Sequence, residues 1–267
     1  MNSAKPLLEN PAPHWKYDLP VPNDPPSRAP SAQTLTNPPN HVNDVYLELP
    51  RSSFKTRGFC VWAAIALFIL AITSFFFQIS IITNLRSFHS LAAFFFGLTA
   101  SIVSFWGGVY YWRMDVEAPR DEPIRFNRLR RKVYVYRFHQ DGLRPFSRVA
   151  WGVRTEVYNW EDLRAEVSSV YGPMGTGGLI ETVSLAVVEP GTNKVIDRFH
   201  FAHESDEGEM YWAMAQLFMQ QGPQALPHFP RPPRDWSNES VTFNLARRLA
   251  PKVKWPEDMD LESRSAP

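Results

Sequence analysis

Cysteine is almost absent from this chain of 267 residues, in which Cys60 is the only one. A lone cysteine excludes a disulfide within the chain and a metal site built from several cysteines. The chain also lacks an excess of either charge, because 28 Lys and Arg residues face 27 Asp and Glu residues, for a net charge of +1. Nucleic-acid-binding domains are usually strongly basic, so we expect no nucleic-acid partner.

Charged residues are missing altogether from two apolar stretches, residues 58–82 and 91–112. An α-helix rises about 1.5 Å per residue and the hydrocarbon core of a bilayer is about 30 Å thick, so either stretch is long enough to cross it. Uncharged runs of ~18 residues or more are rarely found in soluble domains. The sequence therefore predicts a transmembrane hairpin over residues 58–112, and a pair of buried helices in a soluble domain is the weaker alternative.

The basic residues beside these stretches predict the topology, because Lys and Arg in short flanks are retained on the cytoplasmic side. Three basic residues lie shortly before the first stretch and seven lie shortly after the second, whereas the loop of residues 83–90 holds only Arg86 and His89. We expect both termini in the cytoplasm and this short loop on the far side of the membrane.

Proline dominates the two ends of the chain. Eleven prolines fall within residues 1–50. We therefore predict that residues 1–57 form a disordered tail. Two apolar islands, His14 to Leu19 and Val42 to Leu49, could dock on the domain or on a partner, or could be scattered aromatics of a tether. Residues 223–267 form a second Pro-rich tail, with a short helix predicted near 238–250, capped by Ser237 or Asn238.

Between the tails, residues 113–222 form the predicted globular domain. Alternating apolar residues predict a β-hairpin of 124–126 and 133–138 that turns at 127–131, followed by strands at 149–153, 155–160, 163–171, 179–188 and 195–202. The period then becomes helical between Met210 and Phe218, with Asp206 and Glu209 resembling a capping box and with Gly222 ending the helix.

Six or seven antiparallel strands followed by one amphipathic helix is the element order of a pleckstrin-homology-like (PH-like) barrel. We therefore predict an α+β membrane protein in which a two-helix transmembrane hairpin precedes a PH-like antiparallel barrel or sheet closed by one helix. The segments 123–137, 158–167 and 197–200 further resemble an uncharacterised family of proteobacterial two-span proteins, often encoded near type VI secretion and Rhs toxin genes. The resemblance covers residues 40–225. It implies an immunity or accessory role toward a secreted toxin, and it supplies no catalytic residues.

A basic cluster lies about a dozen residues after the second span. Cations close to a membrane surface gain about 1 kcal/mol each from anionic lipids, which makes the cluster a candidate for lipid contact. The alternative is a charged turn that keeps a sheet edge soluble. The cluster consists of Arg125, Arg128, Arg130, Arg131 and Lys132.

A second candidate site is the sequence Trp160-Glu161-Asp162-Leu163, in which two acids lie between two apolar residues at an apparent turn. We interpret Trp160 and Leu163 as core residues and the acids as solvent-facing. The alternative is that Trp160, Glu161 and Asp162 contact a partner protein.

Signs of catalysis are weak. His200 and His203 precede several acids, yet they join the end of a strand to the start of a helix, where acids are favoured by the helix dipole. The Gly-rich segment 172–178 lacks the Lys-Ser/Thr ending of a phosphate-binding loop. We expect no catalytic residues, no metal and no cofactor.

The sequence therefore favours a non-enzymatic binding protein of the bacterial cytoplasmic membrane. Its expected partners are membrane lipids and a secreted toxin or secretion-system protein, and a homo-oligomer stays open. The first alternative is a lipid-sensing membrane scaffold that uses the basic cluster. The second is a membrane-tethered hydrolase that uses His200, His203 and the acids nearby.

Overall fold

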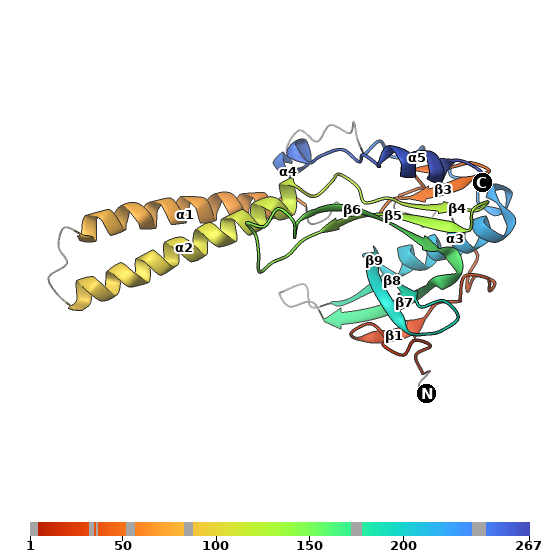
Figure 1. The fold of residues 1–267 in the computed structure, drawn as a ribbon, viewed down its shortest axis with the longest axis horizontal. Helices are drawn as coiled ribbons and strands as arrows, with labels where there is room; N and C mark the ends of the chain where they lie inside the picture. The colour runs from red at the N-terminus through yellow and green to blue at the C-terminus, as the bar shows by residue number, and fades with distance from the viewer. Residues whose placement is uncertain are drawn as a thin grey trace.

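The structure is a computed structural model that describes residues 5–31, 35, 37–51, 57–82, 88–171, 178–236 and 244–267. A helical hairpin projects from one end of a body built of two sheets (Figure 1). We call this body, formed by the residues before and after the hairpin, the sheet domain.

The predicted hairpin is confirmed as two helices that are long and apolar enough to cross a membrane, α1 (Phe59–Ile82) and α2 (Phe88–Val116). Their apolar side chains are largely exposed, as for Phe76 at 65 % and Phe96 at 80 %. Such exposure is typical of a surface that faces lipid rather than water. The helices pack closely where a Cβ atom on Gly108 would come within 2.8 Å of the Phe68 ring, as expected for small residues at helix contacts in membranes.

Two antiparallel sheets make up the sheet domain, and helix α3 (Ser205–Gln221) contacts strands of both. The first sheet has the order β2 (His41–Val42), β3 (Tyr46–Leu49), β4 (Ile124–Asn127), β5 (Lys132–His139) and β6 (Gly152–Asn159). The second has the order β1 (Trp15–Asp18), β7 (Leu163–Tyr171), β8 (Leu179–Val188) and β9 (Val195–Ala202).

The predicted α+β class, the β4–β5 hairpin and the closing helix are confirmed, whereas the described strands do not form a closed barrel. A single strand, β6, replaces the two predicted between residues 149 and 160. The chain changes sheets after β6 through the short 3-10 helix η1 (Trp160–Asp162). The outer edges of β4 and β7 are occupied by β3 and β1, so these edges are not available to close a barrel.

The predicted disorder of the N-terminal tail is wrong for most of that segment, because both apolar islands contribute strands to the sheets. Leu47 and Leu49 of β3 are fully buried, and Leu19 belongs to the same core. The prolines do not prevent this, since they fall mainly in the connections, where their carbonyl oxygens still accept hydrogen bonds. Trp212 of α3 donates through Nε1 to the Pro20 carbonyl oxygen over 2.8 Å, and Gln216 donates to the Val21 carbonyl oxygen over 2.8 Å.

The membrane hairpin is therefore an insertion between two paired strands. β3 ends at Leu49 and β4 begins at Ile124, and these two residues face each other in the antiparallel register. The connection between neighbouring strands is thus the whole helical hairpin. The segments on either side of the hairpin belong to one sheet and must lie on the same side of any membrane that the helices cross.

Helix α3 begins and ends close to the predicted positions, but the predicted capping box is wrong. The N-cap is Glu204 without a side-chain cap bond, and Glu209 accepts a hydrogen bond from the Tyr17 hydroxyl over 2.6 Å instead. Gly222 ends the helix with φ at 93°, a left-handed conformation that glycine adopts without strain.

In the described part of the C-terminal segment, a helix lies within the predicted range 238–250 and a further helix follows it. Helix α4 (Leu245–Leu249) is capped by Asn244, which accepts from the Arg247 backbone amide over 3.2 Å, and it contacts α2. Ser237 and Asn238 lie outside the described residues. Helix α5 (Glu257–Arg264) was not expected from the sequence because it is short and mostly charged, and it packs on β4 and β5.

Candidate functional site

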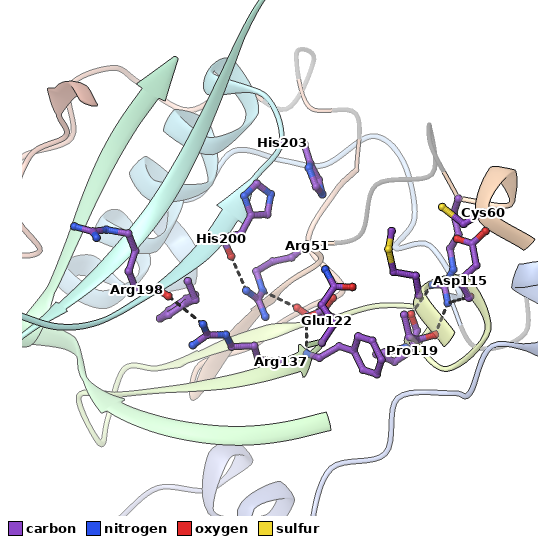
Figure 2. A pocket seen from close by; sticks show the side chains of 15 residues that line it. Arg51, Cys60, Asp115, Pro119, Glu122, Arg137, Arg198, His200 and His203 are labelled. Atoms are coloured by element: carbon purple, nitrogen blue, oxygen red, sulfur yellow. Dashed lines mark hydrogen bonds between the residues drawn. The ribbon is translucent and has the colours of Figure 1, made fainter. Parts of the chain in front are cut away.

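A cavity of about 550 Å³ lies where the bases of the membrane helices meet both sheets (Figure 2). Its cationic lining residues are Arg51, Arg57, Arg137 and Arg198, and its acidic ones are Asp115 and Glu122. The cavity is also lined by His200 and His203, the histidines of the hydrolase alternative. The cavity thus lies at the junction between the membrane helices and the sheet domain, where protein groups hold its charged side chains.

Arg51 ties the two sheets together. Its side chain donates to the backbone oxygens of Glu122 over 2.7 Å, Tyr136 over 2.6 Å and His200 over 2.6 Å. Glu122 lies two residues before β4, Tyr136 is in β5, and His200 is in β9 of the other sheet. Figure 2 shows Arg51 between Glu122 and His200. Burial lowers the pKa of Arg51 from its usual value, while the carboxylate of Glu122 partly offsets this. The buried guanidinium therefore links the two sheets through these three hydrogen bonds.

Arg57 and Asp115 cap each other's helices. The Asp115 carboxylate, near the end of α2, accepts from the backbone amides of Gly58 over 3.0 Å and Val61 over 2.9 Å at the start of α1. Arg57, just before α1, donates to the backbone oxygens of Asp115, Ala118 and Pro119 at and beyond the end of α2. Both pairs have the charge sign that a helix end favours.

Replacing Asp115 by alanine is expected to loosen the start of α1, because two backbone amides lose their acceptor. A lost helix cap costs about 1–2 kcal/mol, which corresponds to about ten-fold faster amide exchange. Hydrogen exchange measured by mass spectrometry on a peptide spanning Gly58 and Val61 tests this in the detergent-solubilised chain. Glu117→Ala is the matched control, since this carboxylate is exposed and pairs with Arg113. Equal exchange in both variants would contradict the reciprocal cap.

The two histidines of the hydrolase alternative lie close together, with ring centroids 4.1 Å apart. Burial lowers the pKa of His200 to about 3, and the charges of His203 and Arg51 act in the same direction. His200 Nε2 is buried without a hydrogen-bond partner in the described part of the chain. The ring is therefore neutral at pH 7.

Two of the acids that follow the histidines, Asp206 and Glu207, bind other side chains. Asp206 pairs with Arg28 over 3.2 Å, and Glu207 accepts from the Tyr211 hydroxyl over 3.3 Å. Among the described residues, no group of three or more His, Cys, Asp or Glu side chains could hold a metal ion. Burial also lowers the pKa of His203, and the carboxylates of Glu122 and Glu204 partly offset this.

The basic cluster predicted for lipid contact lies at the turn between β4 and β5, at the end of the sheet domain opposite the membrane helices (Figure 1). Most of its cations are held by protein groups. Arg125 is buried and pairs with Glu48 and Asp260, and Lys132 pairs with Glu262. Arg130 donates to backbone oxygens of Ser265 and Ala266, Arg131 pairs with Glu161, and Arg128 Nε is buried.

The Trp160 motif is placed as its core interpretation predicts. Trp160 and Leu163 are fully buried, and the Trp160 ring lies 5.0 Å from that of Trp212. Glu161 is exposed and forms the ion pair with Arg131, while Asp162 accepts from Asn159 over 2.9 Å. Trp160 is thus unavailable to a partner, and the two acids already bind neighbouring side chains.

Sequence reasoning missed the junction residues Arg51, Arg57 and Asp115. The two arginines belong to the basic residues before the first stretch that predict the topology, and the sequence assigns no role to Asp115. The available signal was their position, because cations directly before a first span and an acid directly after a second span lie at helix ends that face each other in a hairpin.

Comparison with known proteins finds one family model, which matches residues 101–267 and is described as a family of unknown function, DUF6708. The match covers more than half of the chain. No curated protein and no solved structure matches.

Proposed function

The chain belongs to the DUF6708 family, whose function is unknown, and from that premise we propose that it is a membrane-anchored binding protein rather than an enzyme. Its hairpin crosses the bacterial cytoplasmic membrane, and its sheet domain and both termini lie in the cytoplasm. The excess of Lys and Arg on the flanks of the hairpin supports this orientation.

The observation that carries the proposal is the insertion of the hairpin between β3 and β4. A domain on a flexible tether needs no such arrangement. Here the helices leave the sheet from two paired strands, and the Asp115 and Arg57 caps fix the two helix ends at the junction. The sheet domain is therefore held in one orientation relative to the membrane, which suits a protein that presents a binding surface there.

The proposed partner is a secreted toxin or a secretion-system protein, as the resemblance to proteins encoded near type VI secretion and Rhs toxin genes implies. The sheet domain offers the room for such a contact, because a stable interface needs about 800 Å² on each partner. The short loop between the membrane helices does not. The PH-like relationship of the sheet domain is part of the same proposal. It is supported by the element order of antiparallel strands followed by one helix, although the described strands form two open sheets.

The two alternatives receive less support from the geometry. The cations of the lipid-sensing alternative are mostly paired with the protein and lie at the end away from the helices. Burial lowers the pKa of both histidines of the hydrolase alternative, and Asp206 and Glu207, which follow them, bind other side chains.

Deleting the gene tests the proposal directly. If the protein confers immunity, deletion cells should be outcompeted by their parent under toxin-producing conditions, and the full chain should rescue them. The control is a chain without the hairpin, in which a short turn joins Leu49 to Ile124, and it should rescue poorly. Affinity purification of the full chain should recover a secreted protein in stoichiometric amount. Equal competition, with only lipid or further copies of the chain recovered, would overturn the proposal.

A further inference from the structure

The loop that joins β5 to β6, residues 140–151, turns back along the membrane helix α2 instead of forming a tight turn (Figure 1). The ring of Phe146 stacks on Phe105 of α2 with centroids 6.1 Å apart. Arg113 of α2 donates to the backbone oxygens of Pro145 over 2.5 Å and Ser147 over 2.8 Å. Trp151 closes the loop against Tyr110, at 5.9 Å between ring centroids. The loop is thus docked along the last three turns of α2.

The contact with Phe105 reaches beyond the sheet domain. Phe105 lies eleven residues before the end of α2 at Val116, or about 16 Å along the helix axis at about 1.5 Å per residue. Its side chain is about half exposed in the apolar helix. Because α2 is longer than a bilayer core requires, we place its last turns in the interfacial layer. The contact with Phe105 then shows how far along α2 toward the bilayer core the loop extends.

The loop exposes large apolar side chains that water does not favour. Leu143 and Val149 are each 86 % exposed, and Phe146 is 58 % exposed. Single exposed apolar residues are common, but three within seven residues of one loop, beside an apolar helix, mark an interaction surface. Arg148 lies between two of them and is exposed, and Arg144, also exposed, pairs with Asp141 over 2.7 Å. Long cationic side chains such as Arg148 reach toward lipid phosphates while their stems stay in the apolar layer.

The loop also satisfies much of its backbone internally, which entry into an interface requires. The Trp151 indole donates through Nε1 to the carbonyl oxygens of Asp141 and Arg144, over 3.1 Å each. The backbone amide of Arg144 donates to Asp141 and that of Ser147 donates to Arg144. With the two bonds from Arg113, these contacts leave the apolar side chains as the outward face.

We propose that residues 140–151 are a membrane-docking loop that inserts Leu143, Phe146 and Val149 into the leaflet beside α2. The inference rests on the proposed membrane anchorage. The occupant of the surface is the lipid bilayer, because the loop continues the lipid-facing surface of α2 and pairs apolar side chains with cations. The loop adds a third contact to the two spans and fixes the rotation of the sheet domain about the hairpin axis.

A fluorescent probe on the loop tests the proposal in the full chain. In a Cys60→Ser background, Leu143→Cys is labelled with an environment-sensitive dye, and the protein is reconstituted into vesicles of phosphatidylethanolamine and phosphatidylglycerol. The dye emission should shift to the blue and be quenched by lipids that carry a nitroxide near the top of the acyl chain. Leu261→Cys is the control, because this side chain is 67 % exposed on α5 at the far end of the sheet domain.

The possible outcomes distinguish failure of the docking-loop proposal from failure of the proposed membrane anchorage. Flotation of the vesicles reports whether the chain is membrane-bound. Floating protein with no quenching at position 143 overturns the docking loop and leaves the anchorage standing, whereas protein that does not float overturns the anchorage.

Trypsin gives a second readout without the label or the Cys60 change. Cleavage after Arg148 should be about ten-fold faster in vesicles carrying Leu143→Asp with Val149→Ser, since these side chains no longer hold the loop in the apolar layer. Arg144 is not a trypsin site because Pro145 follows it. Leu261→Asp is the control and should leave this cleavage unchanged. Equal cleavage in the parent chain and the double variant would overturn the proposal.

Discussion

Replacing Leu47 by aspartate is expected to unfold the sheet domain, although Leu47 lies in a segment that reads as a disordered tail. Leu47 is fully buried in β3 and faces Phe126 across the pair with β4. A charge there has no partner and no water, so the loss exceeds about 4 kcal/mol, a large share of the roughly 5–15 kcal/mol that holds a domain folded. Thermal unfolding followed by near-ultraviolet circular dichroism of the detergent-solubilised chain measures it.

Leu7→Asp is the matched control, because Leu7 belongs to the same N-terminal segment and its side chain is 40 % exposed. We expect a change of less than about 0.5 kcal/mol, as for most surface substitutions. A milder variant, Leu47→Ala, should cost about 2–5 kcal/mol and keeps the comparison measurable if the aspartate variant cannot be purified. Similar stability of the Leu47→Asp and Leu7→Asp chains would show that β3 is not part of the core.

Replacing Arg51 by alanine is expected to destabilise the sheet domain by about 3–5 kcal/mol, because buried backbone oxygens lose their donors. These oxygens belong to Glu122, Tyr136 and His200, which lie in or beside strands of both sheets. The loss should therefore appear as separation of the sheets. Chemical denaturation, together with amide exchange in β9, measures both the stability and its location.

Arg51→Lys should recover only part of the loss, since an ammonium group cannot reach three oxygens with the planar geometry of guanidinium. The matched control is Arg154→Ala, an exposed arginine of β6 whose one described hydrogen bond is a long 3.4 Å contact with the Val149 oxygen. It should change stability by less than about 0.5 kcal/mol. If Arg51→Lys restored the full stability, the positive charge of Arg51 would matter and its three hydrogen bonds to backbone oxygens would not.

The hydrogen bonds of Arg51 and Asp115 explain why substitutions at the junction are expected to have larger effects than the sequence suggests. Arg51 and Asp115 look like ordinary flanking charges when the helices are treated as anchors. Once the chain folds, each is buried and each holds backbone groups from elements distant in sequence. A charged residue that flanks a membrane helix can therefore both determine the topology and form hydrogen bonds that stabilise the fold.

The sequence by itself determined the features that depend on local pattern. Length and the absence of charge predicted α1 and α2, alternation predicted the β4–β5 hairpin and β7, β8 and β9, and the 3.6-residue period predicted α3. The prediction that Trp160 lies in the core is also confirmed. A large apolar side chain between two strands is readily buried between the sheets that they form.

Only the tertiary structure decided the features that depend on partners far apart in sequence. The Pro-rich N-terminal segment becomes ordered because α3 donates hydrogen bonds to its carbonyl oxygens and because β4 and β7 offer free edges to its strands. The same edge pairing leaves two open sheets in place of a barrel. The basic cluster faces carboxylates of β3 and α5, which local sequence cannot reveal because those residues lie more than seventy positions away. Periodicity records which face of an element is buried, but the neighbour that covers this face is chosen only when the whole chain has folded.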